Sequence, residues 1–252
     1  ATLLAGLASS EMTRAQYDRA LGAQLQSKAG DQWAYFQAKK LRGAMQRNSL
    51  ELLTATTEVK LIENAVLDKI PVPAPTSMDA TVAAALEAIE QQKPETEIAE
   101  LLKPVEDKSL AAALQAAKDN ALAFETALTP ANQEIEKLEK LVAAGDKDAR
   151  RDMSATKMRF NGARYETEAR VNQTIATCYE LQVRKANISA ERHHKRSGKF
   201  FFGMLAAQAA VIVSTFAIAA QKRSFLWSIA AVAGIAAIIF AVLIPRMRPS
   251  AG

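Results

Sequence analysis

Glu191 and His194 are the residues whose types and spacing come closest to a catalytic site, in the sequence Glu191-Arg192-His193-His194. A glutamate and a histidine three residues apart share one helix face, and two such motifs with two further glutamates hold the metals of di-iron carboxylate bundles. His193 and His194 are the chain's only histidines, so the second motif is missing. We therefore expect no metal site and no cofactor, and we interpret both histidines as pH-responsive residues beside the apolar segments described below.

Nucleophilic catalysis has no better support. The single cysteine, Cys178, lies within an expected helix seam and cannot form an intramolecular disulfide. The sequence has neither a Gly-x-Ser-x-Gly motif nor a glycine-rich loop that follows a strand. We expect no catalytic residues and no enzymatic activity, although a membrane enzyme subunit that uses Glu191, His193 and His194 is an alternative.

The most distinctive local sequence is the aromatic stretch at residues 30–40. Trp33 and Phe36 share one face of a helix, whereas Tyr35 and Lys39 share another, so the stretch can contact two neighbours. We interpret Trp33, Tyr35 and Phe36 as helix-packing residues that meet Tyr179. A ligand or partner epitope is the alternative.

Two long apolar segments determine the class of protein. Phe200–Ala220 and Phe225–Ile244 contain no Asp, Glu, Lys or Arg, and Gln221–Ser224 alone separates them. About 20 residues of helix span the ~30 Å hydrocarbon layer of a bilayer, where each backbone amide must bond within its own segment. The sequence predicts a C-terminal transmembrane helical hairpin. A buried hairpin of a soluble protein is the alternative.

Small residues within the hairpin are spaced for helix packing. Gly203 and Ala207 in the first segment and Ala230 and Gly234 in the second lie four residues apart, which suits close helix contacts. Trp227 is expected at the membrane interface. Ionisable residues, which line conduction pathways, are missing from both segments, so a channel formed by this chain alone is not expected.

The positive charge is concentrated beside the first apolar segment. Residues 1–183 carry 22 Lys and Arg against 26 Asp and Glu, whereas residues 184–199 carry six basic residues against Glu191. Basic residues beside lipid head groups each gain ~1 kcal/mol from anionic lipid. We assign the membrane interface to a collar of Arg192, Lys195, Arg196 and Lys199 and expect binding to a lipid bilayer rather than to nucleic acid.

The same charges predict the orientation. The collar with Arg246 and Arg248 outnumbers Lys222 and Arg223 in the turn, which favours a cytoplasmic body in a bacterial inner membrane. Two adjacent cations in so short a turn weaken this prediction.

The body is expected to be all-α, with a long antiparallel coiled-coil stalk. Residues 11–70 read as an ascending helix and residues 146–199 as a returning helix that continues into the membrane. Between them, residues 71–145 are divided by prolines into short helices that form a small cap, and residues 245–252 form a tail. The returning helix carries a heptad seam of mostly small residues: Met158, Gly162, Tyr165, Ala169, Asn172, Ala176, Tyr179, Val183, Ala186 and Ala190.

The length of the two arms predicts their register. If both arms start at the membrane, the numbers of paired residues should sum to about 210 to 217. The apolar Ala1–Ser10 is too short to cross a bilayer, so we expect it to be the end of a further membrane helix; a processed or frayed terminus is the alternative.

Three sequence segments resemble one family. They are Asp31–Lys39, Tyr179-Glu180-Leu181, and Glu191–His194 leading into Gly203–Gln208. Together they resemble the bacterial membrane proteins catalogued as domain of unknown function 4337. The resemblance covers both arms and the hairpin and is weak over residues 71–145. It implies a membrane helix just before the stalk, and it adds no mechanism because the family has no assigned activity.

These observations together favour a structural role. We expect a non-catalytic, membrane-anchored scaffold or accessory subunit that forms a homo-oligomer or joins a larger membrane complex. The alternative is a membrane-tethered sensor or adaptor that binds a soluble partner through residues 71–145.

Overall fold

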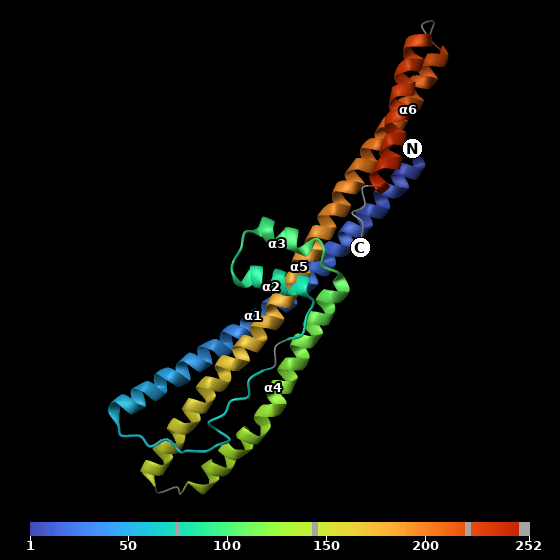
Figure 1. The fold of residues 1–252 in the computed structure, drawn as a ribbon. Helices are drawn as coiled ribbons and strands as arrows, with labels where there is room; N and C mark the ends of the chain where they lie inside the picture. The colour runs from blue at the N-terminus through green and yellow to red at the C-terminus, as the bar shows by residue number, and fades with distance from the viewer. Residues whose placement is uncertain (74–75, 143–145, 220–222, 247–252) are drawn as a thin grey trace. The chain divides into compact units, whose positions relative to one another are not determined.

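The computed structural model describes residues 1–73, 76–142, 146–219 and 223–246, and these residues form an all-α structure (Figure 1). No strand occurs in the ranges described. The helices, in chain order, are α1 (Thr2–Thr56), α2 (Ala80–Glu90), α3 (Glu95–Leu102), α4 (Asp107–Leu141), α5 (Lys147–Ala219) and α6 (Arg223–Arg246).

The chain divides into two compact units. The body unit is Leu25–Gln182, and the anchor unit combines Ala1–Gln24 with Val183–Gly252. Helices α1 and α5 contribute to both units. The prediction that the returning arm continues into the first apolar segment is confirmed, because α5 is a single helix of 73 residues.

In the body unit, α1 and α4 each lie antiparallel to α5. Lys39 pairs with Glu168 and Arg47 with Glu166, and these residue numbers sum to 207 and 213. The predicted register is therefore right to within one helical turn. The heptad seam is confirmed where it packs: Ala169, Ala176 and Tyr179 are buried.

Helix α1 ends at Thr56, so the prediction of a helix up to residue 70 is wrong. The hydroxyl groups of Thr54, Thr56 and Thr57 each bond to the carbonyl four residues earlier, and such back-bonding slightly destabilises a helix. The chain beyond them bonds to α5 instead. The amide of Lys60 donates to Asp152 and that of Ile62 donates to the hydroxyl of Thr156, at 3.1 and 2.9 Å.

The bond from Lys60 makes the stability of this segment depend on pH. The backbone amide of Lys60, with Arg151, lowers the pKa of Asp152 below its ordinary value of 3.8. A lowered pKa stabilises the fold above the ordinary value, and this stabilisation is lost as pH falls through the folded pKa. We expect the Asp152→Asn substitution to lower the unfolding midpoint at pH 7 and to have a smaller effect as the pH falls below 3.8 and the Asp152 carboxyl becomes protonated. An equal loss at both pH values would contradict this role for Asp152.

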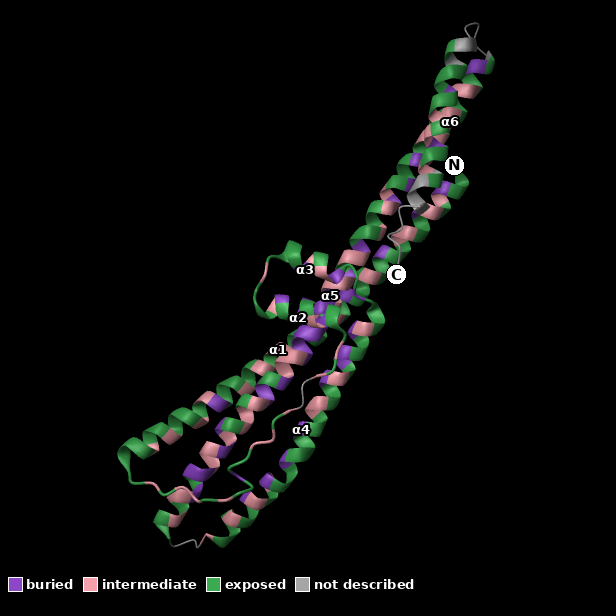
Figure 2. Cartoon of the chain, viewed as in Figure 1, coloured by how far each residue is buried: buried purple, intermediate pink, exposed green. Residues whose placement is uncertain are grey.

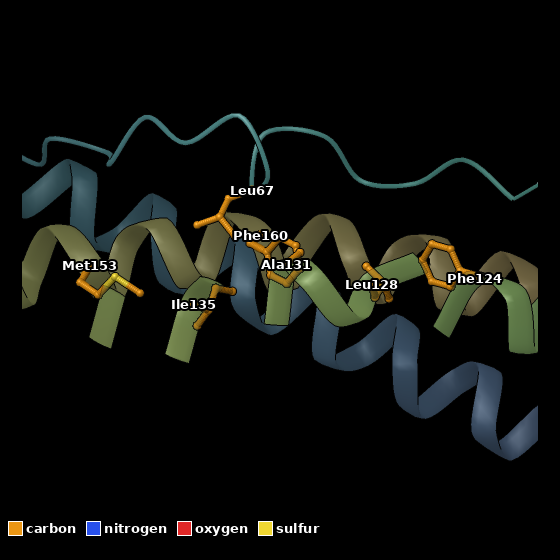
Figure 3. Packing of buried hydrophobic residues seen from close by; sticks show 7 residues of the cluster. All are labelled: Leu67, Phe124, Leu128, Ala131, Ile135, Met153 and Phe160. Atoms are coloured by element: carbon orange, nitrogen blue, oxygen red, sulfur yellow. The ribbon is translucent and has the colours of Figure 1, made fainter. Parts of the chain in front are cut away.

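The chain that follows α1 packs with α4 and α5 in a hydrophobic cluster of the body. Leu67 from the extended segment packs onto α4 and α5, and Figure 3 shows it beside Phe160. The cluster contains Leu67, Phe124, Leu128, Ala131, Ile135, Met153 and Phe160. The description of residues 71–145 as a cap therefore fails for α4, which is a third long helix packed along α5.

Pro130 lies inside α4 and does not end it, contrary to the expectation that prolines divide residues 71–145 into short helices. The proline is exposed, so the carbonyl that loses its helical partner lies on the solvent side. On the opposite face, Phe124, Leu128 and Ala131 are buried as one continuous stripe. Burial of this stripe on both sides of the proline offsets its cost of ~3 kcal/mol.

Helices α2 and α3 form a small pair of short helices, as expected for the start of residues 71–145. Asp79 caps α2 by accepting from the amide of Thr81. Gln92 adopts a positive φ of 54° in the turn, and α2 packs against α4. Their exposed faces carry Glu87, Glu90, Glu95, Glu97 and Glu100.

In the anchor unit, the start of α1 and the end of α5 pack with α6, and Figure 1 shows α6 alongside α5. Leu4 and Ala8 of α1 form a buried cluster with Phe200 of α5 and Ala237 of α6. The residues expected to be the end of a membrane helix are thus helical and packed against the apolar segments.

The apolar residues of α5 and α6 face outward. Val211, Ile212 and Phe216 are 54–63% exposed, and α6 exposes Val232 and Ile238 in the same way (Figure 2). Among the described helices, α5 alone is long and apolar enough to cross a membrane by length and composition, and 11% of its apolar window is buried. A shorter apolar helix covers Trp227–Phe240. Such exposure is costly in water and supports association with a membrane.

Two glycines set the closest approach of α1 and α5 in the body. A Cβ added at Gly43 would lie 3.4 Å from the carbonyl oxygen of Gly162, whereas one at Gly30 would meet nothing within 4 Å. We expect Gly43→Leu to lower the free energy of unfolding by about 1 kcal/mol through overpacking. Gly30→Leu should raise it by several tenths because leucine favours helix. Thermal unfolding of both variants checks this, and equal midpoints would show that the helices are not closely packed at Gly43.

Candidate functional site

A buried cluster of charges joins α1, α4 and α5 in the body unit. Lys39 of α1 contacts one carboxylate oxygen of Glu168, and the Nε atom of Arg164 lies 3.0 Å from the other. The side chains of Lys39 and Glu168 are 12% and 10% exposed. Arg164 also donates to Asn132 of α4 at 3.1 Å. One carboxylate therefore contacts both cations, and the cluster connects all three long helices.

Two tyrosines surround the ammonium group of this cluster. The Nζ atom of Lys39 lies 5.0 Å from the ring centre of Tyr35 and 5.3 Å from that of Tyr165, and Arg164 stacks over Tyr165 at 4.8 Å. Burial alone would lower the pKa of Lys39, but hydrogen bonds and charge from Glu168 and Tyr35 outweigh it, so the pKa is raised. Lys39 therefore carries a fixed positive charge and serves as a packing element rather than as a proton acceptor.

The aromatic stretch contacts α5 through Trp33. The rings of Trp33 and Phe36 meet edge to face at 5.4 Å, and the indole N–H of Trp33 donates to Glu180. Burial raises the pKa of Glu180, while the bond from Trp33 acts in the opposite direction. Tyr35 is 46% exposed and lies against Lys39.

Tyr179, the expected partner of the aromatic stretch, is buried beside α4. Its ring lies 5.2 Å from the ammonium group of Lys118. Next to it, Cys178 is 1% exposed, and burial raises the pKa of its thiol to about 11. The thiol is therefore protonated at neutral pH, which opposes nucleophilic chemistry.

A second cluster occupies the anchor unit. The Nδ1 atom of His193 lies 2.5 Å from the Glu11 carboxylate, and its Nε2 atom lies 4.0 Å from that of Asp18. One helical turn further along α5, the buried Ser197 hydroxyl donates to the carbonyl of Ala8 at 2.7 Å. These contacts tie the start of α1 to α5 just before the apolar segment begins.

The Glu-x-x-His motif does not form a joint site with these residues. Glu191 lies 3.3 Å from Lys195 of its own helix. Within the ranges that the structure describes, no group of three His, Cys, Asp or Glu side chains could hold a metal ion.

Of the predicted interface residues, the four collar residues lie on α5 close to this cluster, whereas Trp227 lies near the start of α6. Arg192, Lys195 and Lys199 are exposed, Arg196 is half-buried, and Trp227 of α6 is 49% exposed. Gly203 approaches α6 closely, because a Cβ there would lie 2.7 Å from the Cβ of Phe240. Ala207 packs against the Leu4 cluster, whereas a Cβ at Gly234 would meet nothing within 4 Å.

Sequence reasoning missed the partners in both charged clusters. The pairs Lys39 with Glu168 and Glu11 with His193 have residue numbers that sum to 207 and 204. Both sums fall below the predicted range, by at least three and six residues, so the expected register would place Lys39 about one turn or more and Glu11 nearly two turns or more from its true partner. The spacing of Arg164 and Glu168, four residues apart on one helix, was the available signal.

Comparison with known proteins gives one match. Residues 1–132, slightly more than half of the chain, match the family model described as domain of unknown function (DUF4337). The matched range includes residues 71–132, where the resemblance was expected to be weak. No curated protein and no solved structure matches the chain. The chain belongs to the DUF4337 family.

Proposed function

We propose that this protein is a non-catalytic, membrane-anchored helical scaffold or accessory subunit that organises a bacterial membrane assembly. The observation that carries the proposal is that the two parts of α5 have different surroundings. Its first part packs against α1 and α4 through a buried charge cluster, and its last part exposes apolar side chains on several faces. A helix of this kind links a packed body to a bilayer without any further connecting segment.

The proposal includes two membrane crossings in an inner membrane. Gly203 and Phe240 bring α6 against α5, and apolar side chains such as Val211 of α5 and Val232 of α6 are exposed. The charges of the collar favour a cytoplasmic body. A helical hairpin satisfies its backbone hydrogen bonds within each helix, as the hydrocarbon layer requires.

Co-purification from native membranes tests the scaffold role. The tagged full-length chain is extracted in a mild detergent, and its mass is measured by light scattering while its partners are identified by mass spectrometry. We expect an assembly of several chains or a constant ratio to a larger complex. A monomer without a stoichiometric partner, at several detergent concentrations, would contradict the proposal.

A second function, that of an adaptor for a soluble partner, is favoured by the acidic surface of α2 and α3. Glu87, Glu95 and Glu97 are exposed there, and Lys93 is the nearest cation to Glu97 at 2.6 Å. Replacing Glu87, Glu90 and Glu95 with glutamine leaves the packed face of α2 unchanged. Loss of a co-purified soluble protein in this variant supports the adaptor function. Unchanged recovery of every partner contradicts it.

A further inference from the structure

An open groove lies where the collar meets the apolar part of α5. It has a volume of about 430 Å³ and is lined by one face of α1, including Ala5 and Met12, and one face of α5, including His194, Phe201 and Met204. Ligand sites in proteins have volumes of roughly 300–1,000 Å³. The groove belongs wholly to the anchor unit.

The groove changes from polar to apolar along its length. His194 lines one end, close in sequence to the exposed Arg192 and Lys195, while Phe201 and Met204 line the other end within the apolar segment. The eleven residues from His194 to Met204 span ~15 Å of helix. Only the part from Phe200 to Met204, ~6 Å of helix, belongs to the apolar segment, and the part before it lies beside the collar, so the groove lies where head groups meet acyl chains.

The floor of the groove is open at Gly198. A Cβ added there would meet no atom within 4 Å, although the neighbouring Ser197 is buried and bonded to Ala8. The space is therefore free of the protein's own side chains. In a bilayer, an apolar groove at this depth is filled by whatever lies beside it.

We infer that this groove binds an anionic phospholipid, with an acyl chain along Gly198, Phe201 and Met204 and the head group beside His194, Arg192 and Lys195. The inference rests on the proposed membrane crossing of α5 but not on the scaffold role. Charge complementarity favours this occupant, because residues 184–199 carry six basic residues against one acid. Each basic side chain near an anionic head group adds roughly fivefold in affinity.

The test uses the full-length chain in a mild non-ionic detergent, offered phosphatidylglycerol or phosphatidylcholine. Native mass spectrometry counts the lipids retained per chain. We expect phosphatidylglycerol to be retained in preference, and Gly198→Leu, which fills the groove, to lose it at least tenfold. Gly234→Leu is the matched control, since it also adds a leucine at an open glycine and should retain the lipid. Circular dichroism verifies that both variants are folded.

A separate double variant tests the contribution of the basic side chains near the groove. Arg192→Gln with Lys195→Gln should reduce the preference for phosphatidylglycerol about 25-fold while leaving the groove intact. Equal lipid retention by wild type and Gly198→Leu would overturn the inference, as would equal retention of the two lipids by wild type. A change from dimer to monomer in Gly198→Leu, with lipid retention unchanged, would assign the groove to a second copy of the chain. If the protein could be removed from native membranes without detergent, this result would instead contradict the membrane crossing of α5.

Discussion

The Glu168→Gln substitution is expected to lower the free energy of unfolding of the body by about 3–5 kcal/mol, because it leaves two cations buried without their carboxylate. Lys39 and Arg164 both contact Glu168, and the glutamate is 8% exposed. Chemical denaturation can be followed by the fluorescence of Trp33 in a Trp227→Phe background, so that only the body is reported.

Two further variants separate the effect of the cluster from that of charge in general. Lys39→Met should cost less than Glu168→Gln, since Arg164 still neutralises the carboxylate. Arg47→Met removes the exposed pair with Glu166, whose side chains are 49% and 46% exposed, and should cost about 0–1 kcal/mol. If Glu168→Gln were no more destabilising than Arg47→Met, the charges would be solvated, and the cluster would not join the three helices.

The second large effect is expected at Gly203, where α5 meets α6. Even one carbon added there would lie 2.7 Å from the Cβ of Phe240, which is fixed to its backbone and cannot turn away. Gly203→Leu should therefore separate the helices and cost about 3 kcal/mol, at the upper end for overpacking. Thermal unfolding in detergent, with an intramolecular cysteine crosslink between α5 and α6, measures both consequences.

Gly234→Leu serves as the control for this prediction as well. Its added side chain meets no atom within 4 Å, so the crosslink and the unfolding temperature should match those of wild type. A Gly203→Leu protein that crosslinks as efficiently as the control would show that α5 and α6 do not pack at this glycine.

The sequence was sufficient for those features that depend on composition over long windows. Two charge-free segments predict apolar helices whatever their neighbours are, and the small residues of α5 predict its buried seam. Ala169, Ala176 and Ala186 are indeed buried. The all-α class follows from the same long patterns.

Features that depend on a distant partner could not be predicted. No proline or other strong helix breaker lies close to Thr56. The following chain is held by bonds from Lys60 to Asp152 and from Ile62 to Thr156, which are 92 and 94 residues apart in the sequence. Pro130 is tolerated because Phe124, Leu128 and Ala131 pack against α5, which is a tertiary effect. Local propensity alone therefore predicts short helices that form a cap, whereas the structure has one continuous α4 packed along α5.

The partners of Lys39 and His193 were missed for a related reason. A shift of a few residues between two helices of more than 50 residues leaves the heptad pattern unchanged but alters every charged pair. Pattern reasoning thus identifies which faces meet. Named contacts such as those of Glu168 and Glu11 require the register that the folded chain adopts.

The membrane hairpin is the central claim, and a topology reporter tests it most directly. A reporter that is active only in the periplasm is fused after Gly145 in one fusion protein and inserted at Ser224 in a second. The account predicts an inactive reporter at Gly145 and an active reporter at Ser224. The collar should keep the body in the cytoplasm, while the turn between the two apolar segments should lie in the periplasm. Activity at both positions or at neither would contradict a hairpin that crosses the membrane, and the reversed pattern would contradict the cytoplasmic body.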